Sequence, residues 1–77
     1  MNEENKVYVL SVQVEADDSY YADYLYVVGV YSTFDKAKNA ETAYSSDLHE
    51  HGKIQVGIHT IDDYEFHGFR IDEYILE

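Results

Sequence analysis

Hydrophobic and polar residues alternate along the first part of the chain. Residues 6–15 (KVYVLSVQVE) place hydrophobic side chains at every second position and are rich in valine, which predicts a β-strand. Residues 24–31 (YLYVVGVY) are again aromatic and β-branched and predict a second strand. The intervening residues 16–23 combine aspartate with tyrosine, a composition typical of an exposed turn. We therefore expect the two strands to pair as an antiparallel hairpin.

The pattern then changes to the spacing of a helix. Phe34, Ala37, Ala40 and Tyr44 recur every three or four residues and form one apolar stripe, which Ala43 widens. Ser32 stands where a hydroxyl can accept a hydrogen bond from a free amide of the first turn. These features predict a helix of about 12 to 14 residues, capped by Ser32 and ended by the polar residues 47–52 (DLHEHG).

Alternation returns after this helix. Residues 53–61 (KIQVGIHTI) predict a third strand, residues 62–68 an acidic turn, and residues 69–76 (FRIDEYIL) a fourth strand. The predicted order is β-β-α-β-β, a single α+β domain over residues 1–77. We expect the helix to pack on one face of an antiparallel sheet and to leave the other face open.

The length and the cysteine content limit what can stabilise this domain. A chain of 77 residues buries only about 60% of the surface exposed by its unfolded form, so its core is small. The sequence has no cysteine, which excludes disulfides, thiolate metal sites and a thiol nucleophile. A homodimer is therefore the expected source of additional stability.

The charge is strongly negative, with 16 acidic residues against 5 lysines and arginines and a formal net charge of −11. Such a chain repels nucleic acids and acidic membranes, so we expect it to bind neither. Its 16% aromatic content opposes a disordered state. The N-terminus lacks a secretory pattern, and no apolar run approaches the roughly 18 residues of a membrane span, so we expect a cytoplasmic protein.

Catalytic and metal-binding motifs are absent from the sequence. There is no glycine-rich phosphate loop and no nucleophile elbow. His49 and His51 flank a carboxylate, and two further histidines offer other ligands, but an exposed polar loop explains this pair without zinc spacing. Neighbouring acids such as Asp72 and Glu73 point to opposite faces of a strand. We predict no enzymatic activity, no cofactor and no metal, with a metal-dependent enzyme using His49, His51 and carboxylates as an alternative.

Acidic residues and tyrosines together predict a surface that binds a partner. Nine tyrosines exceed what so small a core can hold, and those in acidic turns should be exposed. A duplex of about 30 Å carries roughly 18 phosphate charges, the same order as the net charge of this chain. Residues two apart on a strand lie about 7 Å apart, so Glu15 with Asp17, and Asp63 with Glu65, should form phosphate-like rows. The expected surface consists of Glu15, Asp17, Asp18, Tyr20, Tyr21, Asp23, Asp62, Asp63, Tyr64, Glu65, Asp72 and Glu73.

Two resemblances add to this interpretation. Residues 6–10 (KVYVL), 29–37 (GVYSTFDKA) and 69–74 (FRIDEY) resemble segments of small bacterial and phage domains with a GVYS junction between strand and helix. In size, charge and tyrosine content the chain is similar to phage-encoded DNA mimics, including inhibitors of the nucleoid protein HU. The second resemblance implies an inhibitor that occupies the DNA-binding surface of a basic protein such as HU. The alternative is a non-enzymatic interaction module that dimerises through its open sheet face or an edge strand, with charge serving only solubility.

Overall fold

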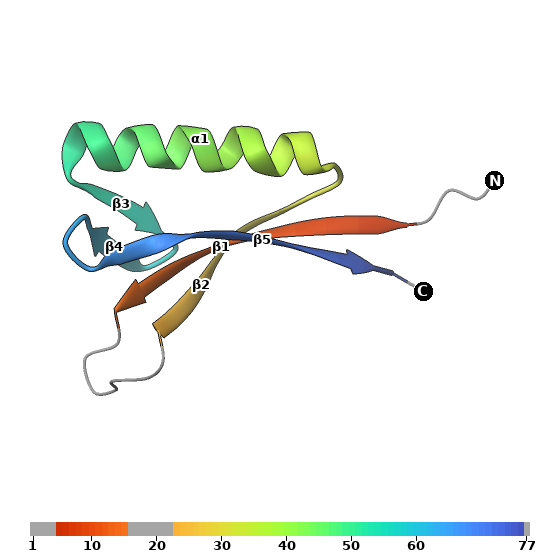
Figure 1. Cartoon of the computed structure of the whole chain (residues 1–77), viewed down its shortest axis with the longest axis horizontal. Helices are drawn as coiled ribbons and strands as arrows, with labels where there is room; N and C mark the ends of the chain where they lie inside the picture. Colours follow the sequence, from red (N-terminus) through yellow and green to blue (C-terminus); the bar gives the residue numbers. More distant parts are fainter. Residues whose placement is uncertain (1–4, 16–22, 77) are drawn as a thin grey trace.

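The computed structural model describes residues 5–15 and 23–76. The elements in chain order are β1 (Lys6–Glu15), β2 (Asp23–Tyr31), α1 (Phe34–His51), β3 (Lys53–Val56), β4 (His59–Asp62) and β5 (Phe66–Ile75). Figure 1 shows α1 lying along the molecule above the strands. The predicted α+β class and the β-β-α-β-β order are confirmed, with the third stretch of strand divided into a short hairpin.

A three-stranded antiparallel sheet of order β2-β1-β5 forms one layer. β1 is therefore the central strand, with β2 on one side and β5 on the other. Val12 lies opposite Tyr26 on β2 and opposite Phe69 on β5. Both pairings shift register once, between Leu10 and Ser11 on the β2 side and between Gln13 and Val14 on the β5 side.

The start of α1 differs from the prediction by one residue. Thr33, not Ser32, is the N-cap, and its side chain accepts a hydrogen bond from the Lys36 amide at 3.1 Å. The Thr33 backbone is extended, with φ −136° and ψ 155°, as expected for a residue just outside the helix. The predicted capping role of Ser32 is wrong because the helix begins at Phe34, which places the threonine three residues before the free amide.

The end of α1 also differs, since the helix contains 18 residues and includes most of the polar segment expected to end it. Leu48 continues the apolar stripe one turn beyond Tyr44 and is buried in the core. Gly52 ends the helix in a left-handed conformation, φ 75°, and its amide donates to the Leu48 carbonyl at 2.8 Å. His49 and His51 consequently lie in the last helical turn and not in a loop.

The predicted third strand is a two-stranded hairpin. Strands β3 and β4 pair with Ile54 opposite Ile61, and the chain reverses at Gly57, whose φ is 63°. A positive φ is accessible to glycine without a steric penalty, which explains why alternation across this glycine did not continue as one strand. The reversal leaves Ile58 at the tip, 91% exposed. The acidic turn is correspondingly shorter than expected, because β5 already begins at Phe66.

The main core lies between the sheet, the C-terminal part of α1 and the β3–β4 hairpin. Its buried members come from all three parts: Val12, Val14, Leu48, Ile54, Val56 and Ile61. The opposite face of the sheet carries no other element of the described chain, so it is open as predicted, and Leu25, Val27 and Val30 are exposed there. Within residues 5–15 and 23–76, no helix is both long enough and apolar enough to cross a membrane.

Candidate functional site

Acidic residues gather at one end of the molecule. There β1 ends at Glu15, β2 begins at Asp23 directly opposite it, and the Glu15 amide donates to the Glu65 carbonyl at 2.9 Å. In Figure 1 this is the end at which β4 turns into β5. We call Glu15, Asp23, Asp62, Asp63 and Glu65 the acidic end. The fold thus joins parts of the first and last predicted acidic turns, which are far apart in the sequence.

The turn between β4 and β5 positions the Glu65 side chain. The Glu65 amide donates to the Asp62 carbonyl at 3.1 Å, and the Glu65 carboxylate accepts from the Asp62 amide at 3.2 Å. Because the chain turns here, Asp63 and Glu65 do not form the extended row that was predicted. Tyr64 at the tip of the turn is 79% exposed, as expected for a tyrosine in an acidic turn.

A histidine lies among the carboxylates of the acidic end. Nδ1 of His67 donates to Oδ2 of Asp23 at 2.8 Å, and its Nε2 lies 4.0 Å from Oε1 of Glu15. The hydrogen bond to Asp23 is the main reason why the pKa of His67 is raised, and the charges of Asp23 and Glu15 add to the effect against a smaller desolvation penalty. His67 therefore joins β5 to β2 across the end of β1.

Three acidic residues elsewhere are paired with a lysine or arginine. Lys6 lies 3.5 Å from Glu73, and Lys38 lies 3.4 Å from Glu41. Arg70 lies 2.8 Å from Asp72 on the open face of the sheet. Asp72 and Glu73, both assigned from the sequence to the partner surface, thus contact different cations and do not join the acidic end. Their opposite orientations follow from the alternation of a strand.

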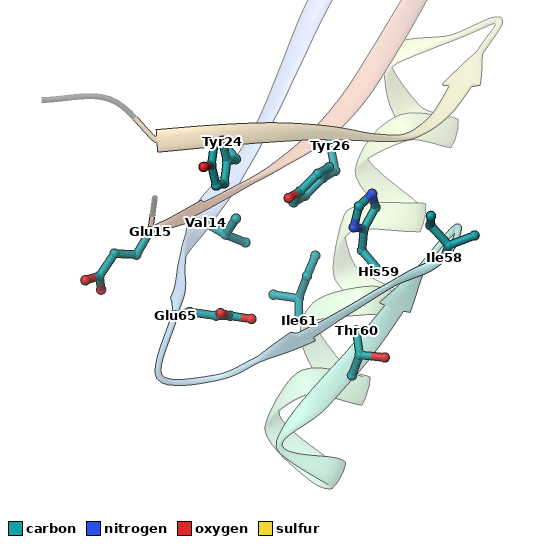
Figure 2. A pocket seen from close by; sticks show the side chains of 9 residues that line it. All are labelled: Val14, Glu15, Tyr24, Tyr26, Ile58, His59, Thr60, Ile61 and Glu65. Carbon is teal, nitrogen blue, oxygen red and sulfur yellow. The ribbon is translucent and has the colours of Figure 1, made fainter. Parts of the chain in front are cut away.

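A cleft of about 300 Å³ opens beside the acidic end, between β2 of the large sheet and β4 of the hairpin. Figure 2 shows the side chains that line it. They come from β1, β2, the hairpin and the following turn: Val14, Glu15, Tyr24, Tyr26, Ile58, His59, Thr60, Ile61 and Glu65. The acidic end and the cleft therefore share Glu15 and Glu65.

Aromatic rings form the upper part of the cleft in Figure 2. The Tyr26 ring stacks on the imidazole of His59, with centroids 4.0 Å apart and planes inclined by 24°. The ring of Tyr24 is next, with its centroid 6.2 Å from that of Tyr26. This cleft was not predicted from the sequence. The two tyrosines stand two residues apart on one strand, which was a signal for a shared face, but the hairpin that brings His59 to them was not predicted.

Four residues of the predicted partner surface lie outside the described residues, namely Asp17, Asp18, Tyr20 and Tyr21. The structure describes the remaining eight: it brings Glu15, Asp23, Asp62, Asp63, Tyr64 and Glu65 to one end and places Asp72 and Glu73 elsewhere.

The histidines are spread over the fold. In the part of the chain that the structure describes, the group that could approach a metal together is Asp47, Glu50 and His51, whose ligand atoms lie within 4.8 Å of one another. All three are exposed, and exposed groups of this kind are common without a metal. His49 is not a member of the group, and His59 and His67 are engaged with Tyr26 and Asp23. The alternative site on His49 and His51 gains no geometric support.

No family model, curated protein or solved structure matches this chain. The two resemblances drawn from the sequence therefore remain predictions, and the functional argument depends on the residues and their arrangement.

Proposed function

We propose that this protein is a non-enzymatic cytoplasmic inhibitor that mimics DNA and occupies the nucleic-acid-binding surface of a basic protein of the HU type. The observation that carries the proposal is the acidic end, where five carboxylates lie within one region of the fold. One lysine, Lys53, lies next to this group, because it pairs with Asp62 across the hairpin. Elsewhere Glu41, Asp72 and Glu73 are each matched by a lysine or arginine. Asp35, Asp47 and Glu50 on α1 have no such partner in the described part of the chain, so the acidic end is the largest of its groups of carboxylates without a lysine or arginine ion pair.

The amount of charge suits a substitute for a duplex. The molecule measures 45 × 29 × 18 Å. A duplex as long as its 29 Å dimension carries roughly 17 phosphate charges, the same order as the net charge of −11. A net charge of magnitude about 2 to 8 is enough for the solubility of a small domain, so the charge exceeds this need.

The mechanism is competition for a cationic surface. Proteins that bind DNA through its backbone and deformability need little base recognition, so a mimic needs negative charge and suitable size but no base-like groups. Long-range attraction accelerates encounter, and exposed side chains such as Tyr64 supply short-range contact. Both the encounter rate and the affinity fall as salt rises, because salt screens these charges.

The test is displacement of a fluorescently labelled duplex from a purified HU-type protein, followed by fluorescence anisotropy. We expect the chain to release the duplex without binding it. Changing both Asp62 and Asp63 to Asn should raise the concentration needed for half-displacement by roughly 2- to 30-fold, the range expected for two exposed charge contacts. Changing Glu41 and Glu73 to Gln removes the same net charge from paired positions and should have a smaller effect.

Two outcomes would contradict the proposal in different ways. A tight complex of the two proteins that leaves the duplex bound would exclude mimicry and preserve a binding role. Equal effects of the two double variants would show that net charge matters and that the acidic end is not the contact surface.

A second candidate function, the interaction module that dimerises, is favoured by the open face of the sheet. Leu25, Val27 and Val30 are 47, 60 and 58% exposed there, next to the mutually neutralising Arg70 and Asp72. A face of three strands about 33 Å long covers roughly 500 Å² per copy, below the about 800 Å² per partner of a standard interface. A dimer through this face should therefore be weak. Sedimentation equilibrium tests it: Val27→Lys should shift a dimer to monomer, and a monomer at all concentrations would exclude this function.

A further inference from the structure

The cleft between β2 and β4 has the size of a site for one long side chain. Its volume of about 300 Å³ lies at the lower limit of small-molecule pockets, which hold about 300 to 1,000 Å³. It is also open to the surface, because Tyr24 on its rim is 46% exposed and Ile58 at the hairpin tip is 91% exposed. An occupant can therefore enter as part of a larger molecule.

The aromatic lining of the cleft offers ring faces to a cation. Stacking on His59 at 4.0 Å fixes the orientation of the Tyr26 ring. Tyr24 is the more exposed of the two neighbouring tyrosines, so its ring remains accessible. Tyrosine rings attract cations within about 6 Å of the ring centre through the quadrupole of the π-system.

The carboxylate of Glu65 makes the charge of the cleft negative. Figure 2 shows the Glu65 side chain reaching into the cleft beside Ile61, while the Glu15 carboxylate points away from the other lining side chains. Glu65 is half-buried, and its Oε1 is held by the Asp62 amide at 3.2 Å. Among residues 5–15 and 23–76, no lysine or arginine forms an ion pair with Glu65. The cleft therefore combines a positioned carboxylate with aromatic rings, and a cation that satisfies both has to come from outside.

We propose that this cleft receives an arginine side chain of the basic partner, an inference that deepens the proposed function and rests on it. A guanidinium group can stack on a tyrosine face while its N–H groups bind a carboxylate. The ammonium group of lysine is compact and strongly hydrated, so it stacks on a tyrosine ring less well. Arginines of DNA-binding proteins enter the narrow, electronegative minor groove. In this protein the cleft takes the place of that groove.

The test uses a minimal probe and its neutral counterpart. Nα-acetyl-arginine methylamide is titrated into the isotope-labelled chain and followed by NMR, in parallel with the citrulline derivative, which has nearly the same shape without the charge. We expect the arginine probe to shift the resonances of Tyr24, Tyr26, His59 and Glu65, with a dissociation constant on the order of millimolar. Absence of these shifts, or equal shifts with citrulline, would overturn the proposal.

A matched pair of variants separates the cleft from the general negative field. Glu65→Gln removes the carboxylate but keeps an oxygen that can accept from the Asp62 amide, and it should weaken the arginine probe about fivefold or more. Asp63→Asn removes the same charge from the same turn, at a residue that does not line the cleft, and should change the affinity by less than about twofold. Equal losses in the two variants would overturn the proposal, since only net charge would then attract the probe.

The duplex displacement assay distinguishes failure of this inference from failure of the proposed function. If the chain displaces DNA from an HU-type protein but the arginine probe leaves the cleft unshifted, the inference is wrong and the mimic stands. If the probe binds the cleft but no DNA is displaced, the cleft is a cation site and the mimicry is wrong.

Discussion

Ser32 and Thr33 are adjacent hydroxyl residues at the start of α1, and their positions relative to the first free amides decide which of them caps the helix. Either residue type serves as an N-cap, so the sequence alone could not distinguish them. The structure shows Thr33 accepting from the Lys36 amide at 3.1 Å, while the Ser32 hydroxyl lies 3.4 Å from the Lys36 ammonium at the surface.

Replacing Thr33 by alanine should lower the free energy of unfolding by about 1 kcal/mol, the typical loss for an N-cap hydroxyl. Ser32→Ala is the matched control and should change it by less than about 0.5 kcal/mol, as for other surface positions. Urea denaturation of both variants gives the two values. A larger loss for Ser32→Ala than for Thr33→Ala would contradict the observed helix start.

At the acidic end the residue of interest is His67, whose raised pKa connects stability to pH. A group whose folded pKa lies above its unfolded value stabilises the fold when it is protonated. The contribution of His67 should be fully present below its ordinary pKa of about 6.5 and be lost as pH rises through the raised folded value.

Changing Asp23 to Asn should lower the pKa of His67, because it replaces the carboxylate that accepts the histidine hydrogen bond. An NMR titration of the His67 ring in the two proteins measures this change. Asp72→Asn, which removes a carboxylate from the distant Arg70 pair, is the control and should leave the titration unchanged. Identical titration curves for Asp23→Asn and the unmodified protein would show that this hydrogen bond does not control the pKa.

At the scale of elements, residues 53–62 form a hairpin that the alternation of hydrophobic and polar residues could not predict. Alternation predicted a strand, and strand residues are indeed present, with Ile54, Val56 and Ile61 buried. Alternation did not distinguish one strand from a hairpin, because hydrophobic residues occur on both sides of Gly57 whether or not the chain turns there. The helix end was missed for a related reason: Leu48 is a single apolar residue among polar ones, and only its packing against the core shows that the stripe continues.

The hairpin predicts the response to substitution of Gly57. In the observed turn, Gly57→Ala should destabilise the protein by about 1 kcal/mol, because alanine in the left-handed region carries a steric cost. Gly57→Asn should cost less, since asparagine tolerates this region. Thermal or urea unfolding of both variants provides the comparison. A stabilising effect of alanine would indicate a continuous strand in place of the turn.

At the scale of the whole molecule, the net charge of −11 affects stability and binding in opposite directions. Self-repulsion of like charges destabilises the compact state, and attraction to a basic partner stabilises the complex. The concentration of five carboxylates at one end makes both effects stronger there. The composition predicted the amount of charge, but the gathering of Glu15 and Asp23 with residues 62–65 depends on the pairing of β1 with β2 and β5, which no local pattern specifies.

Raising sodium chloride from about 20 to 200 mM should therefore raise the melting temperature and weaken the complex with an HU-type protein, because salt screens both interactions. A gain of about 1 kcal/mol would correspond to a shift of about 4 to 8 °C for a domain of this size. Differential scanning calorimetry and anisotropy in the same buffers test the two signs. A melting temperature that falls with salt would show that attractive ion pairs outweigh self-repulsion.

The central position of β1 also has a consequence for how the chain folds. Lys6 pairs with Ile75, so the first and last of the described strands are neighbours in one sheet, and the Leu76 amide donates to the Asn5 carbonyl at 2.7 Å. Contacts between such distant parts of a sequence raise the contact order and slow folding relative to helical domains of the same size. During synthesis β1 emerges first but obtains its second neighbour last. The hairpin of β1 and β2 must therefore wait, with its hydrophobic face only partly covered, until the final strand arrives.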